Sequence, residues 1–179
     1  MKSKKWICLS GGLLILSITL AQVHAEGKFT QKHHHWESRV IVNDNQVAFR
    51  ALTTYAEASD FVVLALDRYP SNCSIQFISM NVVLNAPAKY TYDSKQFFGA
   101  LRIDEMTVHN INYALSAKVG EQVAFVSLTN FEKRTTILDE LRRGANVRLK
   151  LTTDNEEFYL RFSLLGFTAA SNRTLELCT

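Results

Sequence analysis

The sequence contains few residues that break regular structure: two prolines and seven glycines among 179 residues. Because these residues concentrate in turns and irregular segments, their scarcity argues against a loop-rich or low-complexity chain. The sequence also lacks a nucleophile elbow, a phosphate-binding loop, a His-Glu-x-x-His zinc motif and a Cys-x-x-Cys pair. These absences argue against the enzyme and metal-binding classes that such motifs identify.

The first 25 residues have the pattern of a secretory signal peptide. Three lysines within the first five residues precede an apolar stretch, Trp6 to Leu20, and Ala25 ends a small-residue cleavage site. The apolar stretch is shorter than the roughly 20 residues that a transmembrane helix needs. We therefore predict cleavage after Ala25, no transmembrane segment after processing, and a periplasmic or secreted protein.

Removal of residues 1–25 also removes the excess of positive charge. Lys+Arg falls from 20 to 17 with the three signal lysines, which equals the 17 Asp+Glu residues. A neutral chain lacks the basic surplus that is typical of nucleic-acid-binding proteins. We therefore expect a protein partner in the cell envelope or outside the cell, and no nucleic acid.

Two cysteines, Cys73 and Cys178, remain after this processing. In an oxidising compartment an even pair predicts one disulfide. The bond would close a loop of roughly 100 residues, for which chain entropy gives about 4–5 kcal/mol of stabilisation. A metal site or a catalytic thiol is the alternative, but the spacing of the two cysteines does not favour either.

The pattern of residues 37–179 predicts a single, mainly β domain. Val147, Leu149 and Leu151 alternate with polar residues, and the run from Phe158 to Leu164 alternates in the same way, which indicates an antiparallel hairpin. The unbroken apolar run within Asp60–Asp67 favours a strand that is covered on both faces.

A helical period occurs in only two segments. One follows Asn130 and ends before Gly144, and the other ends at Cys178, with Thr168 or Ser171 able to cap its start. We expect an antiparallel β-sandwich or partly closed barrel with two short helices, the C-terminal one tied by the disulfide.

The segment before this domain, residues 26–36, has few core-forming side chains and predicts a flexible polar arm. It contains His33, His34 and His35, which are weak candidates for a metal site because no partner follows at regular spacing, although His109 could in principle join them. A solvated polar arm is the favoured interpretation. Trp36 would mark the point where the arm meets the core.

Two groups of residues are candidates for partner binding. Arg148, Lys150 and Arg161 would share the polar face of the C-terminal hairpin and could meet an acidic partner. Tyr90 and Tyr92 would lie on a loop, where tyrosine adds contact area at low entropic cost. In both cases an ordinary solvated surface is the alternative.

No catalytic residue is predicted. The acidic pairs Asp104-Glu105 and Glu156-Glu157 are adjacent in sequence, so that on a strand their side chains would point to opposite faces. They are typical of turns. His109 is interpreted as an ordinary strand histidine, because a catalytic histidine needs a nucleophile and an orienting acid beside it.

The C-terminal stretch from Phe158 to Cys178 resembles the invasion-associated locus B type of bacterial exported proteins. The residues that carry the resemblance are Phe162, Leu164, Gly166, Phe167, Ala169, Ala170 and Cys178, together with a tryptophan near the mature start. The resemblance implies a periplasmic or secreted envelope protein with no known catalytic residues.

From these observations we expect an exported, non-enzymatic factor that needs no cofactor. Its role would be protein interaction or envelope association, as in virulence-related proteins or components of a secretion apparatus. One alternative is a periplasmic small-ligand carrier, which would need a deep apolar cavity. Another is a hydrolase, which would need a cleft that holds His109 beside a carboxylate and a hydroxyl.

Overall fold

The computed structural model describes residues 26–43, 46–54, 62–129, 134–154 and 156–179. The predicted signal peptide and Asn130, which precedes the first predicted helix, lie outside these residues. The described elements are β1 (Glu26–His33), β2 (Trp36–Asn43), β3 (Gln46–Thr54), β4 (Val63–Tyr69), β5 (Asn72–Val83), β6 (Tyr92–Ile103), β7 (Val108–Ala117), β8 (Val123–Leu128), α1 (Arg134–Arg143), β9 (Asn146–Thr152), β10 (Glu157–Ser163) and α2 (Phe167–Cys178). The expectation of a mainly β fold with two helices is confirmed.

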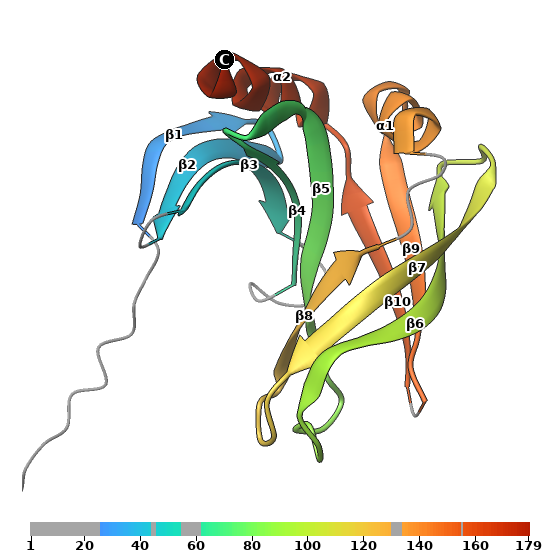
Figure 1. Ribbon diagram of the computed structural model, residues 1–179. Coiled ribbons are helices and arrows are strands. Elements are labelled where there is room, and N and C mark those ends of the chain that lie inside the picture. The colour runs from blue at the N-terminus through green and yellow to red at the C-terminus, as the bar shows by residue number, and fades with distance from the viewer. Residues whose placement is uncertain (1–25, 44–45, 55–61, 130–133, 155) are drawn as a thin grey trace, which may run out of the picture.

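The ten strands form one antiparallel sheet in the order β1-β2-β3-β4-β5-β8-β7-β6-β9-β10. The sheet is not closed, because its edges β1 and β10 do not pair with each other. Figure 1 shows it curling strongly, so that the blue and green strands β1–β5 stand opposite the yellow-green to orange strands β6, β7, β9 and β10. The partly closed form of the predicted fold is therefore the one observed.

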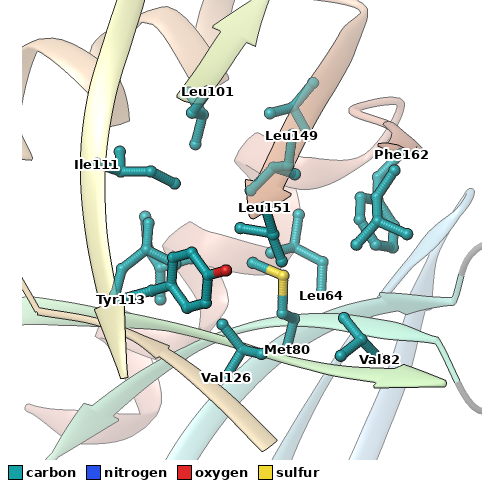
Figure 2. Close-up of a cluster of buried hydrophobic side chains, with 14 of the residues drawn as sticks. Leu64, Met80, Val82, Leu101, Ile111, Tyr113, Val126, Leu149, Leu151 and Phe162 are labelled. Carbon is teal, nitrogen blue, oxygen red and sulfur yellow. The ribbon is translucent and has the colours of Figure 1, made fainter. Parts of the chain in front are cut away.

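Apolar side chains from both halves of the curled sheet meet in its centre. Figure 2 shows this cluster, with Leu64 and Met80 on one side and Leu101, Ile111 and Leu149 on the other. These five side chains are at most 2% exposed. The centre of the curled sheet is thus a cluster of buried apolar side chains, as is normal for a protein core.

Residues 26–36 do not form a flexible arm, so that prediction was wrong. Residues 26–33 form β1, which pairs antiparallel with β2 apart from a bulge between Lys28 and Gln31. Arg173 of α2 also donates from Nη1 to the carbonyl oxygen of Phe29 at 2.9 Å. Backbone pairing holds this strand, and it needs no apolar side chains. The small number of core-forming side chains therefore wrongly suggested that this segment is flexible.

Helix α2 packs over the half of the sheet formed by β1–β5 (Figure 1). The ring of Phe167 contacts Trp36 edge-on, with 4.9 Å between the centroids. Cys73 of β5 forms a disulfide with Cys178 at the helix end, and their Cα atoms lie 5.7 Å apart. The predicted disulfide between these two cysteines is confirmed.

Neither Thr168 nor Ser171 caps α2, contrary to prediction. Gly166 occupies the N-cap position with a φ of 97°, and it makes no side-chain cap. The Thr168 hydroxyl instead donates to the carbonyl oxygen of Arg142 in α1 at 3.2 Å. Ser171 is buried and accepts a hydrogen bond from Gln76 Nε2 at 2.8 Å. Both hydroxyls fix tertiary contacts of the helix.

Among the described residues, no helix is long and apolar enough to cross a membrane.

Candidate functional site

The convex side of β6, β9 and β10 gathers most of the predicted contact residues. Cross-strand pairing places Arg102, Arg148 and Arg161 in one row, since Arg148 pairs with both of the others. The same register places Ala100, Lys150 and Tyr159 in the next row, and Phe98, Thr152 and Glu157 in the row after it. We call this surface the outer face, and it consists of Phe98, Ala100, Arg102, Arg148, Lys150, Thr152, Glu157, Tyr159 and Arg161.

Two of the three predicted cations on this face have acidic partners. Arg148 Nη2 lies 2.8 Å from Glu105 Oε1, and Lys150 Nζ lies 2.8 Å from Glu157 Oε1. The hydrogen bond to Glu157 raises the pKa of Lys150. Arg161 donates from Nε to Asn146 Oδ1 at 3.3 Å, and no carboxylate of the described residues lies within ion-pair distance of it. The structure brings the three together, and their role in binding stays a prediction.

Large apolar side chains are exposed beside these charges. Phe98 is 75% exposed and Tyr159 is 67% exposed, while Lys150 Nζ lies 5.4 Å from the centre of the Tyr159 ring. Sequence reasoning missed Phe98. The adjacent pair Phe97-Phe98 contained the signal, because neighbouring residues of a strand point to opposite faces. Phe97 is buried, so Phe98 faces solvent.

The two predicted loop tyrosines lie at another place. Tyr90 is 70% exposed, but Tyr92 begins β6 and so is a strand residue, which corrects the prediction. Both line a cleft of about 500 Å³, together with Leu115 and Glu156. The Tyr92 ring lies 6.5 Å from that of Phe97, and that contact links it to the core.

A second cleft, of about 570 Å³, lies where β10 approaches β2 and β3; we call it the edge cleft. It is lined by Lys32, His34, His35, Trp36, Glu37, Leu52, Thr53, Thr54, Asn146, Arg161, Phe162 and Ser163. Three hydrogen bonds hold its walls together. Trp36 Nε1 donates to the carbonyl oxygen of Ser163 at 2.8 Å, and the backbone N–H of His35 donates to the carbonyl oxygen of Leu165 at 3.1 Å. Thr53 Oγ1 donates to the carbonyl oxygen of His35 at 2.7 Å.

The histidine run does not converge on one point. His33 Nε2 is 2.8 Å from Ser38 Oγ, and His35 Nδ1 is 2.8 Å from Ser163 Oγ. His34 occupies the turn between β1 and β2, with a φ of 57°. In the part of the chain that the structure describes, no three His, Cys, Asp or Glu side chains group so that they could hold a metal ion.

His109 forms a buried pair with a carboxylate. Its Nε2 lies 2.8 Å from Glu140 Oε2, and the two residues are 2% and 6% exposed. The pair links β7 to α1, and it lines neither the edge cleft nor the cleft beside Tyr90 and Tyr92. A carboxylate is therefore present, but the accessible setting that the hydrolase alternative required is not found at this pair.

The acidic pair Asp104-Glu105 has structural partners. The Asp104 carboxylate accepts hydrogen bonds from the backbone N–H groups of Ala145 and Asn146, at 2.7 and 3.0 Å. These bonds, above all the one from Ala145, lower the pKa of Asp104. Asp104 thus ties the β6–β7 turn to the start of β9, while Glu105 pairs with Arg148.

His33 is expected to make stability depend on pH. Burial and the nearby Arg173 guanidinium lower the pKa of His33 below its usual value. The unfolded chain, with a histidine pKa of about 6.5, then binds a proton before the folded chain does. The contribution of His33 to the free energy of unfolding is fully present above about pH 6.5, and it is lost as the pH falls through the lower pKa of the folded protein.

His33→Gln removes the titration and keeps a hydrogen-bonding side chain for Ser38. We expect the variant to lose less stability than the parent between about pH 7 and pH 5. Urea denaturation at a series of pH values measures this difference. Parallel stability–pH curves for the two proteins would contradict the assignment.

Comparisons with known proteins give a fold and no family. No family model matches the chain, and no curated protein sequence matches it. The chain is similar in structure to invasion associated protein b from Bartonella henselae, with a TM-score of 0.53 and 16% sequence identity. The match covers 83% of this chain and 95% of that chain. At this identity the likeness concerns the fold, which agrees with the resemblance of the C-terminal stretch.

Proposed function

We propose that this chain is an exported, non-enzymatic protein-interaction factor of the cell envelope, related in role to invasion-associated proteins. Two observations support export and the broad role. The Cys73–Cys178 disulfide fits an oxidising compartment. The fold is similar to that of a protein named for its association with invasion, and that similarity spans most of both chains.

The outer face carries the proposal of protein binding. Aromatic side chains and arginine are enriched in protein–protein contacts, and a large exposed aromatic ring at the centre of such a patch is a typical anchor. Phe98 and Tyr159 supply the rings, and Arg148, Lys150 and Arg161 supply a charged surround. Tyr159 is further ordered by its hydrogen bond to Glu157 Oε2 at 2.7 Å.

Two features favour binding over the alternatives. Buried apolar side chains of the described residues meet in the centre of the curled sheet, where a carrier of small apolar ligands would need a cavity (Figure 2). The buried pair of His109 and Glu140 lies away from both clefts, whereas a hydrolytic base must reach its substrate.

Photo-crosslinking at Phe98 tests this function. Phe98→benzoylphenylalanine, irradiated in cells that make the protein, should give a discrete adduct of higher mass, because a bound partner covers this ring. The matched control is Val119→benzoylphenylalanine, whose side chain is 65% exposed in the β7–β8 turn. Equal adducts at both positions, or no adduct at Phe98, would contradict protein binding at the outer face.

A further inference from the structure

The two edges of the sheet differ in regularity. Edge strand β1 has a bulge beside Phe29, whose φ is 53°, and Arg173 of α2 covers the Phe29 carbonyl oxygen. Such devices keep an edge from pairing with another chain. Strand β10 is less protected: its seven residues pair with β9 in unbroken register, from Glu157 to Ser163, and none is proline. A side chain covers its edge at the Ser163 carbonyl oxygen, which accepts the Trp36 indole N–H.

The free side of β10 reaches the edge cleft at its end, where Arg161 and Ser163 line it. The Ser163 carbonyl oxygen accepts the Trp36 indole N–H, which shows the direction away from β9. In a strand, the N–H and C=O groups of alternate residues point the same way. Those of Tyr159 and Arg161 therefore share this direction, and no backbone group of the described residues pairs with them.

The edge cleft has room beside the Arg161 end of this free edge. Arg161 and Ser163 form one wall, and Leu52, Thr54 and Glu37 contribute to the opposite wall. Its volume of about 570 Å³ is typical of ligand-binding clefts. The opposite wall consists of side chains on β2 and β3, whose backbones are already paired on both sides. A single extended segment would therefore gain backbone hydrogen bonds from β10 alone.

The charges of the cleft favour an acidic occupant. Lys32 and Arg161 are its cations, and neither has a carboxylate of the described residues within ion-pair distance. The acid of the cleft, Glu37, lies 3.6 Å from Arg39 Nε, so its charge is already offset. His34, in the turn between β1 and β2, also lines the cleft.

We propose that the free edge of β10 takes up an acidic, extended segment of a partner protein as an additional antiparallel or parallel strand. Backbone hydrogen bonds to Tyr159 and Arg161 would provide affinity, and Lys32 and Arg161 would select carboxylates. The inference rests on the proposed function, since the partner is a protein. It adds a second contact site and the chemistry of the segment that binds there.

A displayed library of random eight-residue peptides, selected against the purified full chain, tests this inference. The expected result is enrichment of peptides rich in Asp and Glu, whose binding is lost when alternate backbone amides are N-methylated. Binding should also slow hydrogen exchange at the amides of Tyr159 and Arg161. Arg161→Gln and Lys32→Gln should each weaken binding of the selected peptides about tenfold, the scale of one charge-assisted hydrogen bond.

Arg143→Gln and Lys118→Gln are matched controls, because both residues are exposed and line neither cleft. They should leave peptide affinity within about twofold. Enrichment of neutral or basic peptides, insensitivity to N-methylation, or a β10-mediated dimer that excludes peptide would overturn the inference. An adduct at Phe98 without peptide binding would reject this edge site alone, whereas peptide binding without a Phe98 adduct would reject the proposed outer face alone.

Discussion

Gly166→Ala is expected to destabilise the protein by about 3–5 kcal/mol, or roughly 10 °C in melting temperature. A Cβ atom at this position would lie 1.7 Å from the carbonyl oxygen of His33. The φ of 97° is in addition a conformation that side-chain-bearing residues avoid, at a cost of about 1–2 kcal/mol. The remaining destabilisation arises because either Gly166 or His33 must move to relieve the overlap.

The contact is the place where the two ends of the curled sheet meet. Moving His33 away from Gly166 would strain the hydrogen bonds of His35 to Leu165 and of Trp36 to Ser163. A buried polar group that loses its partner costs about 1–3 kcal/mol. The expected loss therefore exceeds backbone strain alone.

Gly120→Ala is the matched control, since Gly120 has a φ of 86° but a Cβ atom added there would meet no other atom within 4 Å. It should cost only the backbone strain, about 1–2 kcal/mol. Thermal denaturation of both variants, followed by circular dichroism, gives the comparison. Equal losses for the two variants would show that the approach of Gly166 to His33 does not stabilise the fold.

Period-two alternation predicted strands well where one face is buried. In β10, Phe158, Leu160 and Phe162 are buried and the residues between them are exposed or half-buried. The apolar run before Asp67 became β4, whose central residues are all buried, as a strand covered on both faces requires. The disulfide followed from cysteine count and predicted compartment alone.

Long-range pairing could not be read from the same pattern. Strand β5 pairs with β8, and β6 pairs with β9, across intervening elements. Alternation specifies which side of a strand is buried but not its neighbour, so the strand order stayed open. Strand β1 was missed for a related reason. It is held by backbone hydrogen bonds to β2, and such pairing leaves no apolar pattern in the sequence.

The candidate sites show the same limit. Arg148, Lys150 and Arg161 were grouped from one hairpin, and pairing with β6 then added Phe98 and Arg102 to the same surface. The edge cleft joins Lys32 and His34 to Arg161, which is more than 120 residues later in the sequence. Local sequence patterns hold no signal for such a juxtaposition.

Removal of the disulfide is expected to destabilise the protein by about 4–5 kcal/mol, a large part of the roughly 5–15 kcal/mol typical of a domain. The bond closes a loop with a sequence separation of 105 residues. Its main effect is to restrict the unfolded chain, so that the strands should still form without it. The melting temperature should fall by roughly 8–20 °C.

The helix should respond unevenly to this change. Its first half keeps contacts that do not need the disulfide, from Phe167 to Trp36 and from Ser171 to Gln76. Thr174 also still accepts a hydrogen bond from Arg68 Nε at 3.3 Å. Residues 175–179 are exposed or half-buried, and the Cys178 bond is what holds them to β5. Loss of the bond should therefore fray this last turn first.

The test compares the parent protein with Cys178→Ser and with the double variant Cys73→Ser/Cys178→Ser, which leaves no free thiol in this pair. Both variants should melt at similar, lower temperatures and retain strand signal in circular dichroism. Limited proteolysis should cut them first after Leu175. Mass spectrometry of the unreduced parent should show the Cys73–Cys178 link. Two free thiols in the parent, or an unchanged melting temperature in the double variant, would mean that packing of Phe167 and its neighbours holds α2 without the disulfide.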